Sequence, residues 1–141
     1  MKIAVIDGQG GGIGRVIVEK LRHEIGQKCS IIGLGTNAVA TSIMLRAGAN
    51  EGASGENAVI FNVGRVDFIV GSVAVIAANG FSGEMSASMA AAVASSPAAK
   101  ILLPLNRCGI EIIGASDEPL PVQVDQLVYR VKTMFMNING K

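Results

Sequence analysis

A segment near the amino terminus concentrates glycine between a short apolar run and an amphipathic stretch. It reads Asp7-Gly8-Gln9-Gly10-Gly11-Gly12-Ile13-Gly14-Arg15. Glycine lacks a Cβ atom, so it permits a tight turn and a close approach of the backbone to a phosphate. The free N–H groups at the start of the following helix, with the helix dipole behind them, favour an anion there. The segment therefore predicts a site for a phosphate-containing ligand. The alternative is a tight turn that packs well and binds nothing.

The spacing of these glycines resembles a known pattern. No register fits the common GxGxxG spacing, whereas Gly8-x-x-x-Gly12-x-Gly14 resembles the TGxxxGIG pattern of short-chain dehydrogenases, with Asp7 in place of Thr. The resemblance covers about the first 25 residues, where a strand and a helix are expected on either side of the turn. It implies NAD or NADP as the cofactor, bound through Asp7, Gly8, Gly10, Gly12, Ile13 and Gly14.

The sequence is less informative about the nucleoside part of such a ligand. Proteins of this type usually place an acidic residue at the end of the second strand, where it bonds the ribose hydroxyls. The corresponding segment here, Gly33-Leu34-Gly35-Thr36-Asn37, has no carboxylate. Thr36 or Asn37 either bonds a ribose or caps the next helix, and both readings stay open. Arg107 follows a later strand and is the candidate clamp for an anion.

The catalytic residues of short-chain dehydrogenases do not carry over. That family uses a Tyr-x-x-x-Lys pair, but the only tyrosine, Tyr129, is followed four positions later by Thr133, and Lys132 is one position short. The sequence also has no GxxxxGK[ST] segment, which excludes a Walker-type phosphotransferase. With His23 as the only histidine, expected on a solvent-facing side of a helix, a Ser-His triad is not favoured.

Three other side chains are candidates for chemistry, each with a structural alternative. Cys108 is the only plausible nucleophile, or else a small buried apolar residue. Glu56 and Glu84 are candidate acids or bases, or else they stabilise helix dipoles at helix starts. All three follow predicted strand ends or begin predicted helices, at the rim where open parallel sheets bind ligands.

Short β-branched runs alternate with helical patterns, which is typical of a parallel sheet covered on both faces. The expected fold is α/β, a three-layer Rossmann-like domain over residues 1–141 with a mostly parallel sheet of about five strands. Ser54 is expected to cap a helix containing Glu56, although Val59–Val63 also fits a strand. The other expected strands are 2–6, 30–34, 67–71, 100–105 and 109–113, and the other expected helices are 12–27, 37–47, 82–95 and 121–136.

Composition excludes several classes of protein. The chain has 141 residues, of which 50% are hydrophobic and 16% charged, with a net charge of +1. This balance favours a packed core and gives no electrostatic basis for binding nucleic acid or a membrane surface. Two cysteines and one histidine cannot make a disulfide scaffold or a structural zinc site. We expect a cytoplasmic protein without a signal peptide or membrane span.

Beyond the glycine-rich turn, nearly the whole chain resembles a family of small bacterial proteins known only as a domain of unknown function. The resemblance is carried by Ala53–Ala58, Ser82–Met85 and Lys100–Cys108. It implies a Rossmann-like fold and no particular activity. The leading hypothesis is a nucleotide- or dinucleotide-binding protein. The alternatives are a non-catalytic homo-oligomeric interaction or sensor protein, dimerising through its Ala-rich helix, and a phosphate enzyme that uses Cys108 or Glu84.

Overall fold

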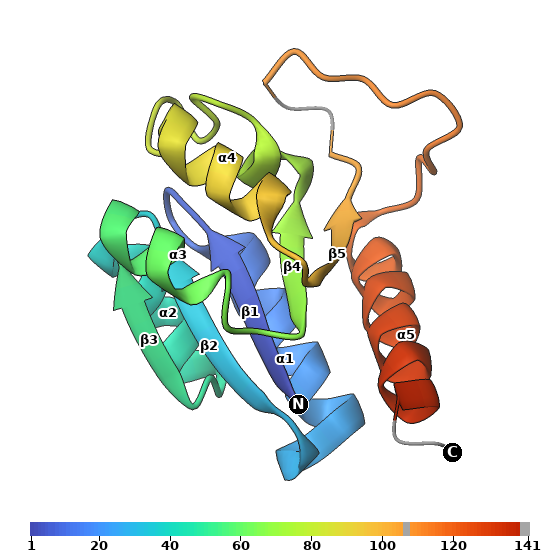
Figure 1. Cartoon of the computed structure of the whole chain (residues 1–141). Helices are drawn as coiled ribbons and strands as arrows, with labels where there is room; N and C mark the ends of the chain where they lie inside the picture. Colours follow the sequence, from blue (N-terminus) through green and yellow to red (C-terminus); the bar gives the residue numbers. More distant parts are fainter. Residues whose placement is uncertain (106–107, 139–141) are drawn as a thin grey trace.

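A five-stranded parallel sheet organises the described part of the chain. The computed structural model describes residues 1–105 and 108–138. The sheet has the order β3-β2-β1-β4-β5, and all four pairings are parallel (Figure 1). The strands are β1 (Lys2–Asp7), β2 (Ser30–Gly35), β3 (Glu51–Ser54), β4 (Phe68–Ser72) and β5 (Ala99–Leu103). The expected α/β, Rossmann-like fold is confirmed.

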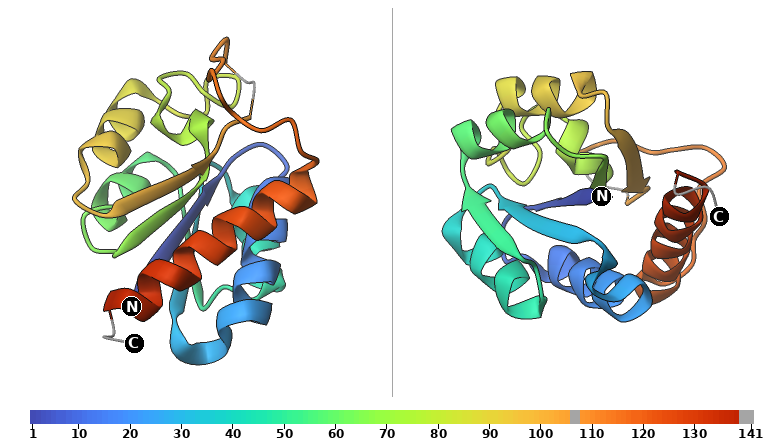
Figure 2. Two further views of the ribbon diagram at one scale, coloured as in Figure 1. Left: turned by 90° about the vertical axis from the view of Figure 1, so that its right-hand side faces the viewer. Right: turned by 60° about the horizontal axis from the view of Figure 1, so that its bottom comes forward.

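Helices cover both faces of this sheet (Figure 2). One face carries α1 (Gly12–Ile25), α2 (Ala38–Ala47) and α5 (Leu120–Ile138), and the other carries α3 (Glu56–Asn62) and α4 (Ala87–Ser95). Two short 3-10 helices, η1 (Gly26–Lys28) and η2 (Val73–Ile76), follow α1 and β4. Each face has its own apolar core against the sheet. No described helix is long and apolar enough to cross a bilayer.

The strand order places a topological switch beside β1. The chain runs from β1 outward through β2 to β3, then returns to β4 on the other side of β1. The helices that follow β1 and β4, namely α1 and α4, therefore lie on opposite faces of the sheet. In open parallel sheets, ligands bind beyond the carboxyl ends of the strands at such a point. The glycine-rich turn follows β1 directly, so it lies at the switch.

The sequence patterns explain the most secure elements. Ile3, Ala4, Val5 and Ile6 of β1 are at most 1% exposed, because a central parallel strand is covered on both faces. Helix α5 buries one stripe with helical spacing, formed by Val124, Leu127, Val128 and Val131. Pro121 lies in its first turn, where the missing N–H has no cost.

The expected strand at 109–113 is wrong. Residues 109–113 lie in the connection between β5 and α5 and belong to no strand. Gly109 (φ 69°) and Gly114 (φ 88°) turn the backbone at its two ends, and Ile113 is 93% exposed. Its apolar residues resemble a strand, but in the described part of the chain β5 pairs only with β4 and ends the sheet.

Two helix starts also differ from expectation. The helix expected at Ser82 begins at Ala87, because Ser86 provides the cap by accepting the N–H of Met89. Ser54 does not cap α3 but ends the short strand β3, which the sequence did not predict. Its hydroxyl donates to Thr41 Oγ1 at 2.7 Å. The segment around Val59 is helical, so the strand alternative is wrong.

Candidate functional site

The carboxylate of Asp7 bonds both ends of the glycine-rich turn. The side chain is 4% exposed at the end of β1. Its Oδ1 accepts the N–H of Gly8 at 2.8 Å, and its Oδ2 accepts the N–H of Gly14 at 2.6 Å. Because Gly14 belongs to the first turn of α1, one carboxylate joins the strand end to the helix start. Asp7 therefore orients the turn through its backbone.

Two glycines of the turn are required by close packing. Gly11 has φ 75°, and a Cβ atom there would lie 2.8 Å from the Cα of Ala40. A Cβ atom on Gly14 would lie 2.7 Å from the sulfur of Met44. Both contacts bring α2 against the start of α1. These positions fit the packing explanation of the motif.

Gly10 and Gly12 have a different environment. A Cβ atom on either would meet no atom of the described residues within 4 Å, so packing among those residues does not explain the glycine. The N–H groups of Gly12 and Ile13, the first two of α1, find no acceptor among the described residues. They lie at a hollow of about 200 Å³ lined by residues 7–13 and Phe81. Two N–H groups without such an acceptor at the start of a helix are suited to bind an anion.

A second hollow adjoins the first at the switch between β1 and β4. It measures about 360 Å³ and is lined by Gln9, Ala74, Asn79, Phe81, Ser82 and Cys108. The two hollows share Gln9 and Phe81. Cys108 is exposed there, so the expectation of a buried apolar role for it is wrong, whereas Cys29 is buried.

Glu84, in the connection between η2 and α4, also contacts the glycine-rich turn. Its Oε1 accepts the N–H of Gln9 at 2.8 Å, the hydroxyl of Thr36 at 2.6 Å and the side-chain amide of Asn37 at 2.9 Å. We call these three bonds the Glu84 contact. They join the η2–α4 connection to the ends of β1 and β2. The hydrogen bond from Thr36, followed by that from Gln9, lowers the pKa of the Glu84 carboxyl below its ordinary value.

Thr36 and Asn37 thus lie beside the glycine-rich turn, as the sequence predicted. Asn37 is also the N-cap of α2, since its side-chain oxygen accepts the N–H of Ala40 at 2.9 Å. The capping interpretation is therefore confirmed for Asn37. The hydroxyl of Thr36 bonds Glu84. Ribose binding by either residue stays a prediction.

The remaining candidates are spread out. Glu56 opens α3 and accepts a hydrogen bond from the Ser86 hydroxyl, so it links α3 to the cap of α4. The side chain of His23 is 78% exposed and contacts Glu24, away from the turn. Arg107 lies outside the described residues, and its role as an anion clamp stays a prediction. Within residues 1–105 and 108–138, no group of three His, Cys, Asp or Glu side chains could hold a metal ion.

The sequence did not identify the segment that covers the site. Asn79, Phe81 and Ser82 all have positive φ, which is uncommon outside glycine. The ring of Phe81 lies so close to Gly8 that a Cβ atom on that glycine would be 2.7 Å from it. The pairs Asn79-Gly80 and Ser82-Gly83 are turn signals that favour such a segment. They do not indicate what the turn would contact.

Acidification is expected to release the Glu84 contact. Because the folded-state pKa of Glu84 is depressed, the contact contributes stability above the ordinary carboxyl pKa and loses it as pH falls through the folded-state value. The amide resonances of Gln9 and Thr36 should shift together in an NMR titration below about pH 4.5. In Glu84→Gln this titration should be absent. An unchanged titration in that variant would assign it to another group.

Comparison with known proteins gives a family and one distant fold relative. The sequence matches DUF3842, described as a domain of unknown function, over residues 2–136. No curated protein matches it. Among solved structures, it is similar to the crystal structure of a dodecameric FMN-dependent UbiX-like decarboxylase from Escherichia coli O157:H7. The TM-score is 0.46 at 13% identity, over 96% of this chain and 94% of the other. A likeness this distant carries no argument about ligand or activity.

Proposed function

This chain belongs to the DUF3842 family, and we propose that it binds a nucleotide or dinucleotide whose phosphate lies on the turn formed by residues 8–14. One observation carries the proposal. The N–H groups of Gly12 and Ile13 have no acceptor among the described residues, and both residues line a hollow of about 200 Å³. Two aligned N–H groups and the dipole of a 14-residue helix would stabilise a phosphate there.

The rest of the ligand would extend into the second hollow. That hollow adjoins the first through Gln9 and Phe81 and lies where the strand order reverses. Cys108, on its wall, is the candidate nucleophile. Glu84 is engaged by three donors, which does not favour it as a general base. Any reaction would therefore depend largely on the chemistry of the ligand itself.

Between the two nicotinamide cofactors, the site favours NAD. The end of β2 has no acidic residue of its own, but the Glu84 contact brings a carboxylate to Thr36 and Asn37. The second oxygen of Glu84 has no hydrogen-bond donor among the described residues, so it is suited to accept from a ribose hydroxyl. The same charge would repel the 2′-phosphate of NADP.

Thermal unfolding with added ligand tests the proposal. The panel is NAD, NADP, their reduced forms, ATP, FAD and FMN. A ligand at about 100 times its dissociation constant should add about 2.7 kcal/mol to the free energy of unfolding, which raises Tm by several degrees. NAD should give a larger shift than NADP, and Cys108→Ser should retain it. No shift with any ligand would overturn the proposal and favour the interaction protein.

Gly12→Val is the sharpest variant for this site. A Cβ atom on Gly12 would meet no described atom within 4 Å, so valine should be accepted without a clash while adding bulk beside the N–H groups of the turn. We expect the ligand-induced shift to disappear while the Tm of the free protein changes by only a few degrees. The matched control is Gly64→Val, another glycine whose Cβ atom would meet nothing within 4 Å. A ligand shift that persists in Gly12→Val would place the phosphate elsewhere.

A further inference from the structure

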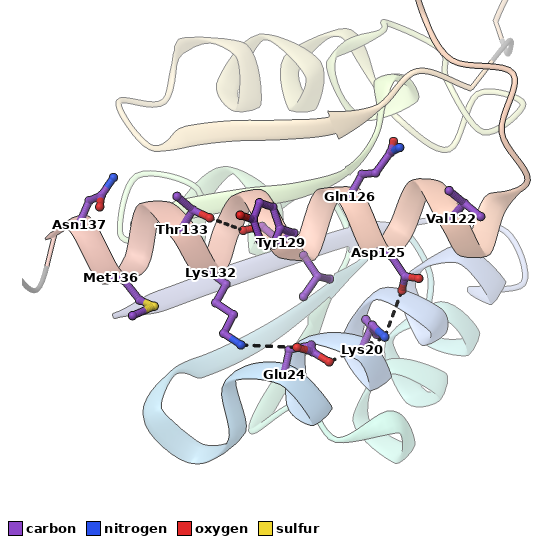
Figure 3. A pocket seen from close by; sticks show the side chains of 11 residues that line it. Lys20, Glu24, Val122, Asp125, Gln126, Tyr129, Lys132, Thr133, Met136 and Asn137 are labelled. Carbon is purple, nitrogen blue, oxygen red and sulfur yellow. Dashed lines mark hydrogen bonds and ion pairs between the residues drawn. The ribbon is translucent and has the colours of Figure 1, made fainter. Parts of the chain in front are cut away.

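Helix α5 exposes a row of large side chains along its outer side. Tyr129 is 72% exposed, Met136 48% and Val122 38%. Spacings of three and four residues place five side chains on one face of the helix. We call this row, formed by Val122, Gln126, Tyr129, Thr133 and Met136, the α5 stripe. It borders a groove of about 680 Å³ between α5 and α1 (Figure 3).

The charges beside the α5 stripe cancel. Asp125 pairs with Lys20 of α1 at 3.1 Å, and Lys132 pairs with Glu24 of α1 at 3.5 Å (Figure 3). With two cations and two anions, the groove attracts neither an acidic nor a basic partner. A second copy of the chain would present the same two cations and two anions. Each charged side chain could then face one of opposite sign across the interface.

We propose that the α5 stripe is the interface with a second copy of this chain, the two α5 helices antiparallel about a two-fold axis at Tyr129. Val122 and Met136 lie seven residues before and after Tyr129, two helical turns in each direction. The axis therefore places Val122 against the partner's Met136. It also brings Asp125 near the level of the partner's Lys132. Apolar and charged positions are both self-complementary, as an isologous interface requires.

The dimensions of the surface suit a small interface. The 19 residues of α5 give a helix about 28 Å long, and with α1 beside it the face is about 20 Å wide. Each copy would then contribute roughly 560 Å², which gives a total slightly above the ~1,000 Å² of a specific contact. A tyrosine at the centre is typical of residues that dominate binding energy. The expected dimer is reversible, and its formation does not require a ligand at the turn.

Sedimentation of the full chain tests this interface. Between about 1 and 500 µM, a range bracketing the micromolar affinity of such a surface, the mass should rise from 14.5 kDa toward twice that value. Tyr129→Glu should raise the dissociation constant of the dimer at least tenfold. Phe61→Glu, on α3 at the other face of the sheet, is the matched control and should leave it unchanged. Both side chains are more than half exposed, so both variants should keep the wild-type circular dichroism spectrum.

A disulfide tests the position of the axis. In a Cys108→Ser background, which removes the exposed native thiol, Tyr129→Cys places two thiols at the axis. Diamide should oxidise them to one S–S bond and yield a covalent dimer, whereas Phe61→Cys in the same background should stay largely uncrosslinked. A monomer throughout the range, a dimer insensitive to Tyr129→Glu, or equal crosslinking of the two variants would each overturn the proposal. Binding of a different partner at the groove with no self-association would do the same.

Discussion

Replacing Asp7 by alanine is expected to lower the free energy of unfolding by about 3 kcal/mol. The carboxylate is buried and accepts the N–H groups of Gly8 and Gly14, and both would lose an ionised acceptor. For a domain of this size, the loss corresponds to a fall in Tm of about 10 °C. Urea and thermal denaturation measure it directly.

Two variants make this result specific. Asp7→Asn keeps the shape and one oxygen acceptor, so it should lose about half as much stability as alanine. Asp117→Ala removes a carboxylate from the exposed connection before α5 and should change stability by less than about 0.5 kcal/mol. If Asp7→Ala were no more destabilised than Asp117→Ala, the turn would not depend on the carboxylate.

Gly14→Val is expected to destabilise the protein by about 2–3 kcal/mol. The new Cβ atom would lie 2.7 Å from the sulfur of Met44 and 3.0 Å from the Cβ of Asp7. Met44 is fully buried, so its flexible side chain can move only by disturbing the core below α2. The added methyl groups increase the crowding.

The same substitution two residues earlier provides the comparison. Gly12→Val meets open space, so its free energy of unfolding should stay within about 1 kcal/mol of wild type. Urea denaturation of the two variants side by side therefore separates the packing glycine from the ligand glycine. Equal destabilisation would contradict that division of the motif.

Local periodicity was enough to predict most of the fold. Buried parallel strands such as β1 and β4 form continuous apolar runs, and α5 has clear helical spacing. Strand β3 was missed because Glu51-Gly52-Ala53-Ser54 is mostly exposed and has neither an apolar run nor alternation. The strand expected at 109–113 failed for the opposite reason. Its apolar residues pair with no strand among residues 1–105 and 108–138.

The sequence indicated which residues gather at the carboxyl ends of the strands, but it did not indicate the contacts between them. The turn at residues 8–14 lies between a strand and a helix, as its spacing indicated. The arrival of Glu84 at Thr36 and Asn37 depends on how a connection with positive φ at Phe81 and Ser82 folds across the sheet. No periodic pattern encodes that path, because it is set by contacts between distant segments.

The Glu84 contact also has a consequence for folding and local motion. Its three bonds join residues 47, 48 and 75 positions apart. The entropy of closing such loops favours their formation only after β1, β2 and β4 have assembled. Since its partners are exposed, the contact can also open locally while both apolar cores stay intact. Opening of this contact is thereby separated from global unfolding, and a more stable core would not slow it.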